Sequence, residues 1–424
     1  MENERKVIEY HSKQGKKVEN LMHYINKETL MKQHKKQTKG KATGIDGINK
    51  EEYDIKIESN IEDLIVRMKQ MSYRPKAVRR TYIPKANGKM RPLGIPAYED
   101  RLVQGCMADI LNEIYECKFL ECSYGFRPNR NCHQVIREIN QEIMYQGGNY
   151  ILDCDIKGFF DNVNQEWLMK FLEHDINDKT FLRYIKRFLI SGYMEEMKYY
   201  ESDKGTPQGG LISPILANVY LHYVLDIWFE NAIKPRLKER ARLIRYCDDF
   251  IIMFRNEEDA KKVYEVLPKR LRKFGLEIEQ DKTRILPFGR YKGTRETFDF
   301  LGFTHFNSKT RTGKYTVGHK ISKKKKKAKF QAITKWLKEN RHIGISNLIE
   351  GLNKKIIGTY AYYGINGMLG ELYKLYYHAR YELLNVINRR SQRKIKYSRY
   401  ITILERVPIA KPKIYKDIWC WNAK

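Results

Sequence analysis

Hydrophobic residues near the N-terminus recur at helical spacing. Within the stretch 60–71 one helix face carries four of them: Ile61, Leu64, Ile65 and Met68. Such spacing is typical of an amphipathic helix with one buried side. The pattern changes at RRTYIPKANGKMRPLGIP (79–96), where two strand-like stretches flank Asn87-Gly88, a dipeptide that favours a tight hairpin turn. The chain is therefore expected to begin mainly helical and then to form a β-hairpin.

Beyond this hairpin, helical and strand patterns alternate. Apolar spacing predicts helices at 100–116, 168–176, 181–190, 212–233 and 258–275. Shorter apolar runs predict strands within 149–160, 245–254, 276–288 and 298–306. From residue 320 onward the pattern is helical and basic, with a proline-containing segment near the end. Because no glycine-rich nucleotide-binding loop interrupts the alternation, we predict a mixed α+β fold with a helical appendage.

The net charge of the chain indicates what kind of partner it binds. The chain carries 81 Lys and Arg against 51 Asp and Glu, a formal charge of +30. Residues 320–400 hold 20 of the cations and four acids, so 16 of the 30 net charges lie there, interleaved with tyrosines. Cations repel one another unless a polyanion neutralises them, and aromatics among cations suit base stacking. The alternative is a solvated helix face whose tyrosines form a local core. We expect a nucleic-acid partner.

Cysteines and hydropathy indicate the compartment. The seven cysteines are an odd number and form no C-x-x-C pair, which favours reduced thiols over a disulfide framework or a zinc ribbon. No stretch approaches the roughly 18 apolar residues of a membrane span, and the N-terminus is charged from its second residue. We expect a soluble, cytoplasmic protein with no membrane partner.

Two adjacent aspartates interrupt the apolar hairpin RYCDDFIIMF (245–254). Asp248 and Asp249 would sit at its turn, where neighbouring carboxylates repel each other unless a cation lies beside them. Asp153 and Asp155 lie two apart, and so on one face, in the predicted strand NYILDCDIKGFF. Mg²⁺ prefers carboxylate and water oxygens and usually adds substrate phosphates. The alternative is a solvated turn, but acids on two apolar strands favour a metal site.

The residues around these aspartates resemble the bacterial group II intron-encoded reverse transcriptase/maturase family. Tyr246-Cys247-Asp248-Asp249 is similar to the Y-x-D-D box of reverse transcriptases. Other matching blocks follow in the family's order: GIDG (44–47), RRTYIPKANGKMRPLGIPAYEDRLVQ (79–104), SYGFRPNRNCHQVI (123–136), DCDIKGFFDNV (153–163), GTPQGGLISPILANVYLHYVLD (205–226), LEIEQDKT (276–283) and FLGF (300–303). The resemblance spans roughly residues 44–303.

The resemblance implies a right-hand polymerase fold. Fingers and palm would combine antiparallel sheet with helices, and the thumb and maturase (X) region would be helical. The implied divisions are an N-terminal extension and start of the fingers (1–75), fingers (76–148), palm with finger insertions (149–318), thumb/maturase region (319–400) and a C-terminal segment (401–424). The implied function is RNA-directed DNA polymerase with capacity to bind intron RNA as a maturase.

The resemblance also assigns the chemistry. Asp155, Asp248 and Asp249 would be catalytic and would hold two Mg²⁺ ions about 3.5–4 Å apart, with Mn²⁺ able to substitute. One ion would activate the primer 3′-hydroxyl and the other would bind the triphosphate. Asp155 and Asp248 are the expected direct ligands.

Five residues are expected to contact the incoming dNTP. Phe160 matches a bulky gate that collides with a ribose 2′-hydroxyl; the alternative is a plain core phenylalanine. Lys85 and Arg91, on the two arms of the fingers hairpin, would bind the triphosphate, although either could be an ordinary surface cation. Gln208 would hydrogen-bond near the nucleotide. Lys282 would protonate departing pyrophosphate, unless it is simply a solvated lysine at a strand end.

Template and primer contacts are expected elsewhere. Three residues, Arg127, Asn129 and Arg130, would contact the template backbone. Gly209 would let the main chain approach a base pair closely. The segment 301–303 resembles the primer grip: Leu301, Gly302 and Phe303.

Departures from the family limit the biological role. Cys247 replaces a small residue that is most often Ala, and no His/Asn and paired-cysteine endonuclease pattern follows the helical region, so target-strand cleavage in cis is not expected. Expected partners are an RNA template, a DNA or RNA primer, dNTPs and a structured intron or noncoding RNA, in a bacterial cytosol; the oligomeric state stays open. A dedicated cellular reverse transcriptase for phage defence or repair is the alternative. A splicing factor on a decayed polymerase fold is disfavoured because all three carboxylates are present.

Overall fold

The computed structural model describes residues 2–84, 90–196, 198–201, 204–206, 209–390 and 394–419. The chain forms two compact units, each described below by itself. Unit one comprises residues 1–131 and 150–285, and unit two comprises residues 132–149 and 286–424. The predicted boundaries of fingers, palm and thumb lie at different residues from the boundaries of these units, and they stay a prediction.

Unit one contains most of the predicted helices. Its helical segments are α1 (Glu2–Lys13), η1 (Leu21–Tyr24), α2 (Lys27–Lys36), α3 (Lys50–Asp54), α4 (Ile57–Lys69), α5 (Tyr98–Tyr115), α7 (Phe159–Asn162), α8 (Gln165–Asp175), α9 (Lys179–Leu189), α10 (Ser213–Leu221), η2 (His222–Asp226), η3 (Trp228–Ile233), η4 (Lys234–Arg236), α11 (Glu257–Lys273) and η5 (Gln280–Lys282). Several begin where an Asn or Asp side chain accepts a backbone N–H, as Asn164 does for α8 and Asp178 for α9. The prediction of a helix at 60–71 is confirmed within α4, whose Ile61, Leu64 and Met68 are buried.

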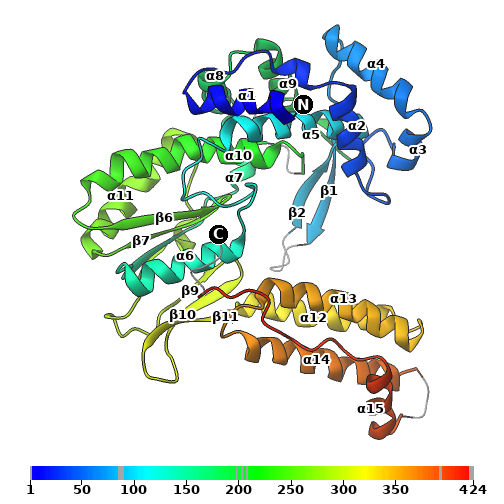
Figure 1. The fold of residues 1–424 in the computed structure, drawn as a ribbon, viewed down its shortest axis with the longest axis vertical. Coiled ribbons are helices and arrows are strands. Elements are labelled where there is room, and N and C mark those ends of the chain that lie inside the picture. Colours follow the sequence, from blue (N-terminus) through cyan, green and yellow to red (C-terminus); the bar gives the residue numbers. More distant parts are fainter. Residues whose placement is uncertain are drawn as a thin grey trace. The chain divides into compact units, whose positions relative to one another are not determined.

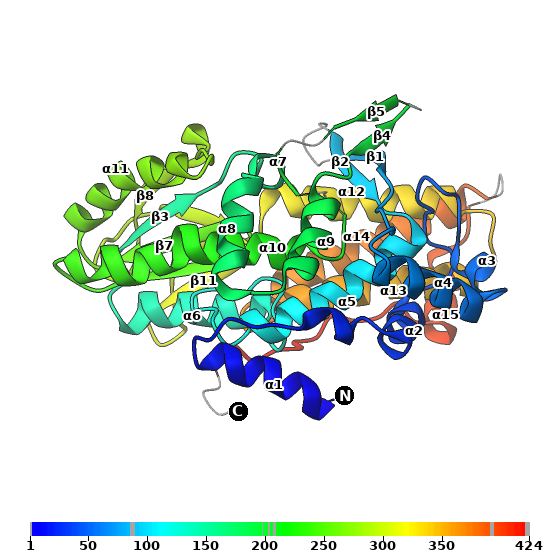
Figure 2. The same ribbon diagram turned by 90° about the horizontal axis from the view of Figure 1, so that it is seen from above.

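The long helix predicted at 212–233 begins at Ser213 as expected but changes its winding. After α10 it continues in the wider π-helical form through η2 and η3. Its first part is buried on almost every side, because α10 packs on both α5 and α8 (Figure 2). Wider turns shift the phase of the side chains, and π-helical turns often occur at functional sites.

Two sheets organise unit one. The first has the order β6-β7-β3-β8, with β3 (Tyr150–Cys154), β6 (Ala241–Tyr246), β7 (Asp249–Phe254) and β8 (Arg284–Pro287). The β6–β7 hairpin is antiparallel with Tyr246 opposite Asp249, which confirms the prediction of a hairpin with the aspartates at its turn. Strand β7 is buried along nearly its whole length, so the charged turn is attached to an apolar core.

The second sheet of unit one has the order β2-β1-β4-β5. Strands β1 (Val78–Pro84) and β2 (Met90–Ile95) pair antiparallel, as predicted; the Asn87-Gly88 turn lies outside the described residues. The sequence did not predict the second hairpin, β4 (Tyr193–Glu195) and β5 (Lys198–Tyr200), which extends the sheet in Figure 2. Parallel pairing of β1 with β4 joins the two hairpins.

Unit two combines a small sheet with long helices. Its strands are β9 (Thr297–Phe300), β10 (Phe303–Lys309) and β11 (Tyr315–Ile321) in the order β11-β10-β9, and its helices are α6 (Cys132–Tyr145), α12 (Lys323–Glu339), α13 (Ile345–Tyr363), α14 (Leu369–Asn388) and α15 (Tyr397–Arg406). Helices α12, α13 and α14 pack side by side around their own apolar core (Figure 1). The predicted basic helical region after residue 320 is confirmed.

A buried pair of histidines lies in the sheet of unit two. His305 on β10 faces His319 on β11, with ring centroids 5.0 Å apart. The ring of Phe298 stacks on His305 at 4.6 Å, and His319 Nε2 lies 3.1 Å from Asn140 Oδ1. Neither ring nitrogen of His305 has a hydrogen-bond partner among the described residues. Burial therefore lowers the pKa of both imidazoles, that of His319 to about 4.

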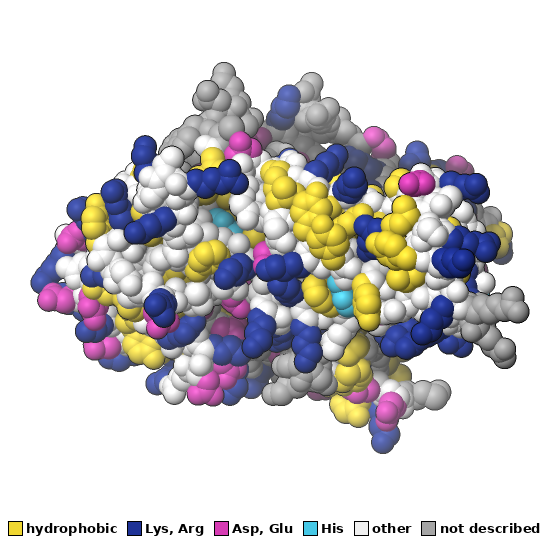
Figure 3. All heavy atoms as spheres, turned by 90° about the horizontal axis from the view of Figure 1, so that it is seen from below, with side chains coloured by type: hydrophobic (Ala, Val, Ile, Leu, Met, Phe, Trp, Pro, Cys, Tyr) yellow, Lys and Arg dark blue, Asp and Glu magenta, His cyan; other side chains and the backbone are white. Residues whose placement is uncertain are grey.

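The tyrosines of residues 320–400 divide between core and surface. Tyr360 and Tyr363 of α13 are buried, whereas Tyr377 and Tyr381 of α14 are 59% and 62% exposed. Figure 3 shows a face of the molecule on which Lys and Arg side chains lie between exposed hydrophobic ones. The interpretation as a local core is thus confirmed for the buried tyrosines, and base stacking by the exposed ones stays a prediction. None of the helices among the described residues has the length and apolar character needed to cross a lipid bilayer.

Candidate active site

The predicted carboxylates meet at one end of the sheet in unit one. Strand β3 pairs antiparallel with β7 and ends with Cys154 opposite Phe250, so Asp155, one residue further, comes opposite Asp249. Asp248 occupies the β6–β7 turn itself. The strand period of two had placed Asp153 and Asp155 on one face, but β3 stops before Asp155. Backbone pairing holds this residue instead: Glu279 N donates to Asp155 O at 2.8 Å.

The electrostatics of the turn reflect three neighbouring acids whose charges are only partly offset by cations. Loss of hydration among surrounding protein atoms raises the pKa of Asp248 above its ordinary value, and the charge of Asp155 raises it further. The same effects raise the pKa of Asp249 to about 7, although its side chain reaches solvent, and Asp248 adds most among the neighbouring charges. Arg91 acts in the opposite direction on both. A cation placed here would relieve this repulsion.

Lys282 is the closest cation to the carboxylates. Its Nζ lies 2.5 Å from Asp155 Oδ2, and this bond raises the pKa of Lys282. Lys282 ends the short helix η5, directly after the segment that pairs with the Asp155 backbone. The predicted pyrophosphate-protonating lysine therefore lies against a predicted metal ligand.

The donor set suits a hard divalent cation, because it consists of carboxylates. Their negative charges repel one another when no cation lies between them. Among the described residues, no three acidic, histidine or cysteine side chains already form a closed metal-binding group. Lys282 occupies one oxygen of Asp155. The residues thus fit a metal by chemistry, and Asp155 would turn from Lys282 toward the β6–β7 turn to share an ion.

The predicted sugar gate lies on the short helix that follows β3. Phe160 is half-buried, and its ring packs edge-on against the fully packed Phe159 at 5.3 Å. Its carbonyl accepts a hydrogen bond from Thr206 N at 2.8 Å. Phe160 is therefore held at the surface of the core, directly beside the glycine-rich loop.

The glycine-rich loop 205–210 needs its glycines for contacts within the protein. A Cβ at Gly209, whose φ is +112°, would lie 2.2 Å from Gly94 O of β2. A Cβ at Gly205 would lie 2.5 Å from Phe160 O. The backbone at Gly209 approaches strand β2 closely, and the predicted approach to a base pair stays a prediction. Of the remaining dNTP predictions, Arg91 lies on β2 opposite Ile83, whereas Lys85 and Gln208 lie outside the described residues.

The predicted template contacts differ in their surroundings. Arg127 is 6% exposed, and its guanidinium donates to Glu116, to Leu120 O and to Ser123 O. These bonds assign Arg127 to holding its own loop, which corrects the expectation that its side chain is displayed to template. Arg130 pairs with Glu121 at 2.8 Å but lies nearer the surface, and Asn129 is exposed with a left-handed φ of +59°.

The predicted primer grip belongs to unit two. Leu301 and Gly302 form the tight turn between β9 and β10, both with positive φ, and Leu301 O accepts from Tyr362 Oη at 2.8 Å. A Cβ at Gly302 would lie 2.8 Å from Tyr363 Oη. Phe303 is fully buried and stacks on Tyr362, so its side chain is a core element, and a primer contact by this segment stays a prediction.

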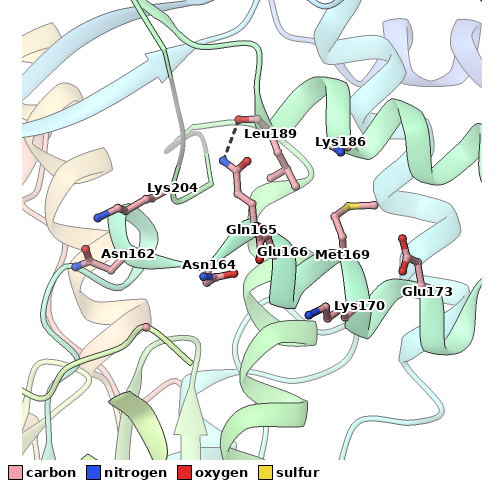
Figure 4. Close-up of a pocket in the computed structure, with 11 residues that line it drawn as sticks. Asn162, Asn164, Gln165, Glu166, Met169, Lys170, Glu173, Lys186, Leu189 and Lys204 are labelled. Atoms are coloured by element: carbon pink, nitrogen blue, oxygen red, sulfur yellow. Dashed lines mark hydrogen bonds between the residues drawn. The ribbon is translucent and has the colours of Figure 1, made fainter. Parts of the chain in front are cut away.

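A cavity of about 750 Å³ lies on the other side of the glycine-rich loop. Figure 4 shows Gln165 inside it, donating to Leu189 O at 3.2 Å; Gln165 also donates to Gly205 O at 3.1 Å. The rest of its lining is mixed and includes lysines such as Lys204, amides such as Asn162, the two acids Glu166 and Glu173, and apolar side chains. None of the three predicted catalytic carboxylates is among the described residues that line it, so this cavity is separate from the acidic site.

Sequence reasoning missed the residues beneath the β6–β7 turn. Arg245 is completely buried and paired with Asp226, which is equally buried, at 2.6 Å. In a chain with 81 cations, only its place directly before the Tyr-Cys-Asp-Asp box distinguished Arg245. Phe126 was also missed: it is 57% exposed with a φ of +55°, next to Gly125, which touches the backbone of Cys247.

A family comparison agrees with this geometry. The model of the family described as Reverse transcriptase (RNA-dependent DNA polymerase) matches residues 83–305, more than half of the chain. The chain belongs to the reverse transcriptase family, whose members copy an RNA template and generally use divalent metal ions.

Two individual relatives show which members of this family the chain resembles. The group II intron-encoded protein LtrA of Lactococcus lactis subsp. cremoris is 36% identical over 263 residues, which cover 58% of this chain and 44% of that protein. Protein YkfC of Escherichia coli (strain K12) is 31% identical over 322 residues, covering 68% of this chain and 82% of that protein. The chain thus spans less than half the length of LtrA. The resemblance to group II intron-encoded proteins is confirmed.

A distant likeness exists among solved structures. A telomerase from Candida albicans, in complex with a fragment of telomeric RNA, aligns with a TM-score of 0.45 and 13% sequence identity over 84% of this chain and 65% of that chain. At this level the likeness adds nothing to the assignment. The predicted α+β fold of the right-hand polymerase class is confirmed by the family match together with the observed mixture of helices and antiparallel sheets.

Proposed function

We propose that this protein is an RNA-directed DNA polymerase that copies RNA into cDNA by nucleotidyl transfer. The observation that carries the proposal is the meeting of Asp155, Asp248 and Asp249 at one end of an apolar sheet, where burial and neighbouring carboxylates raise the pKa of Asp248 and Asp249. Lys282 pairs with Asp155, yet the pKa values of the two turn aspartates stay raised, which a simple solvated turn does not explain. Two bound Mg²⁺ ions, with Mn²⁺ as a substitute, account for the three acids.

The three carboxylates would hold the ions, with Asp155 and Asp248 as the direct ligands. The bound metal would make the primer 3′-hydroxyl acidic and neutralise the triphosphate. In the reaction, the bond from the 3′-oxygen to the α-phosphorus forms while the bond to pyrophosphate breaks, and the hydroxyl proton leaves. Lys282, already protonated beside Asp155, can supply a proton to the departing pyrophosphate.

Residues around the carboxylates would bind and select the nucleotide. Arg91 acts electrostatically on both turn aspartates and would bind the triphosphate together with Lys85. Phe160, held between the core and the loop 205–210, would exclude a ribose 2′-hydroxyl, with Gln208 bonding near the nucleotide. In this assignment Arg130, Asn129 and the loop containing Gly209 contact the template, and the 301–302 turn contacts the primer.

Unit two would hold the nucleic acid. Its basic helices correspond to the thumb/maturase region of the relatives, and the proposed partners are an RNA template, a DNA or RNA primer, and a structured intron RNA bound as a maturase. A bacterial cytosol is the proposed location. The alternative, a dedicated cellular enzyme for defence or repair with its own noncoding RNA, is separated from this role by whether intron RNA domains flank the reading frame.

Primer extension on an RNA template tests the polymerase proposal. Asp248→Asn and Asp155→Asn should each abolish extension while leaving RNA affinity nearly unchanged, because the affinity comes from basic surface rather than from the site. Asp281→Asn, the same chemical change at an exposed acid next to Lys282, is the matched control and should extend normally. Extension at the wild-type rate by either site variant would refute the assignment.

A further inference from the structure

The turn that carries the two catalytic aspartates has a strained backbone. Cys247 has a φ of +60°, a left-handed conformation that side-chain-bearing residues adopt only when their surroundings impose it. Its side chain is 5% exposed, and burial raises the pKa of its thiol. Something beneath the turn must therefore hold this conformation.

Arg245 provides that support, with one N–H of its guanidinium on the turn and the other four on the residues around it. Nε and Nη2 donate to the two carboxylate oxygens of Asp226 at 2.8 and 2.6 Å. Nη1 donates to Cys247 O and to Asn218 Oδ1, both at 2.9 Å, and Nη2 also donates to Ser123 Oγ at 2.8 Å. A guanidinium has five N–H donors, and all five are used. Lysine, with three donors at one point, could not reproduce this set.

The same network reaches the turn from its other side. Asn218 Nδ2 donates to Gly125 O at 2.7 Å, and Gly125 lies so close to the turn that a Cβ there would be 2.4 Å from Cys247 N. The main chain of Arg245 is also fixed, because its N–H donates to Cys122 O and its carbonyl accepts from Tyr124 N. Cys247 is thus held at both its carbonyl and its amide.

A buried ion pair is a poor way to stabilise a fold. Apolar residues of similar volume are often as stable or more stable, since both charges lose their hydration on burial. Asp226 lies in the π-helical segment η2 and Asn218 in α10, so the winding change of this helix sets both against Arg245. Such a pair is better explained by the single conformation that it imposes on its neighbours.

We propose that Arg245, oriented by Asp226 and Asn218, is a positioning residue that locks the Tyr-Cys-Asp-Asp turn in the one conformation that presents Asp248 and Asp249 to the reaction. Its catalytic consequence rests on the proposed polymerase function, but the ordering of the turn does not. Arg245 itself touches no substrate, because it is completely buried.

Two variants separate positioning from stability. Arg245→Lys keeps a positive charge beside Asp226 but loses the set of hydrogen bonds that the planar guanidinium makes. The double variant Arg245→Met with Asp226→Leu removes the ion pair and keeps the site apolar, so its melting temperature should stay near that of the wild type. Arg255→Lys is the matched control, since Arg255 lies at the other end of the same hairpin in an exposed pair with Glu239 at 3.1 Å.

Two readouts are expected to change together. Hydrogen exchange of the amides of residues 246–250 should accelerate in both variants, while exchange elsewhere in β6 and β7 stays slow. Single-nucleotide incorporation on a bound primer should lose kcat, on the order of 100-fold for a misplacement of this kind, with RNA affinity and dNTP KM little changed. Arg255→Lys should change neither readout.

Three results would overturn the proposal. The first is wild-type exchange at 246–250 in a folded variant, and the second is accelerated exchange with wild-type kcat. The third needs no variant: in the wild type itself, rapid exchange of the Asp249 and Phe250 amides relative to Ile251 and Ile252 would show that the turn is not locked. Because exchange is measured without substrate, it tests the locking even if the protein proves to have no polymerase activity.

Discussion

The carboxylate site of unit one and the basic helices of unit two use charge in opposite ways. In unit one, three acids are gathered within a few residues of one sheet end, on buried strands and a locked turn. In unit two, cations are spread along helices whose lysines mostly face solvent. Chemistry needs a few groups in fixed geometry, whereas affinity for a polyanion grows with the number of charges. The two properties should therefore be separable by mutation.

The five-lysine run makes the contrast sharper, because its members are not equivalent. The run forms the start of α12 and is not a linker. Lys323, Lys324 and Lys327 are exposed, but Lys326 pairs with Glu371 at 2.9 Å and is part of the fold. Reversal of the whole run would mix lost binding with lost stability.

The largest effect that we expect is on binding. Lys323→Glu, Lys324→Glu and Lys327→Glu together should weaken RNA binding and shorten cDNA products, while single-nucleotide incorporation on a bound primer changes little. Each lost phosphate contact should reduce the slope of log K against log[salt] by about 0.7–0.9. Binding isotherms at several salt concentrations measure this slope.

Its control is the reversal of three exposed lysines on α11 of unit one: Lys262, Lys269 and Lys273. This triple variant has the same net charge as the first. Equal slopes for the two triple variants would mean that total charge, and not the α12 surface, determines binding.

A smaller effect on binding should come from the exposed tyrosines of unit two. Tyr377→Ala with Tyr381→Ala should cost about 1–3 kcal/mol of RNA affinity for each base that stacks there. Because no charge is removed, the salt slope should stay unchanged, unlike that of the lysine variant. Tyr291→Ala, at a 79% exposed tyrosine outside the helices, is the control. A changed slope would contradict a stacking role.

In unit one, the expected effect of Phe160→Ala is on selection rather than on affinity. Removing the ring should let rNTPs compete, with discrimination falling on the order of 10- to 100-fold, the range for one steric contact in a pocket. RNA binding should not change. Competition between dNTPs and rNTPs in extension assays measures the ratio, and an unaltered ratio would make Phe160 a core residue only.

The last expected effect is a difference in acid stability between the units. His305 and His319 are neutral in the folded state, and their pKa values lie below the 6.5 of the unfolded chain. Below pH 6.5 the unfolded state therefore binds more protons, and stability falls as the pH drops toward 4. At pH 5 the loss for His319, whose pKa in the folded state is about 4, is about 2 kcal/mol, and His305 acts in the same direction.

In unit one, a second buried group partly offsets the loss of stability at low pH. Burial lowers the pKa of His222 to about 4, but it raises that of Asp100 to about 7, so the folded state gains a proton there as the pH falls. Hydrogen exchange at pH 7 and pH 5 should show a greater loss of protection in unit two. His305→Phe should reduce that loss, and an unchanged loss of protection in unit two with this variant would exclude the histidine pair as its cause.

Much of this protein is determined by its sequence alone. The apolar residues on both sides of Asp248 and Asp249 require a charged turn on a buried hairpin, and the ordered motifs identify the family. Helical spacing places α4, the start of α10 and the basic helices, because a periodic apolar face can be buried in only one way. These are local properties, readable from neighbours along the chain.

Tertiary structure alone decided which of many similar side chains face inward. Among the 81 Lys and Arg residues, Arg127 and Arg245 have buried guanidinium groups that hydrogen-bond within the protein. Lys326 differs from its neighbouring lysines only because it pairs with Glu371, and the side chain of Phe303 lies in the core. Arg245, Lys326 and Phe303 each depend on a partner distant in sequence, such as Ser123 and Asn218 for Arg245. Arg127 instead depends on the folding of its own loop back onto Glu116. Hydrogen-bond satisfaction of a buried charge is set by three-dimensional neighbours, and no periodicity along the chain encodes them.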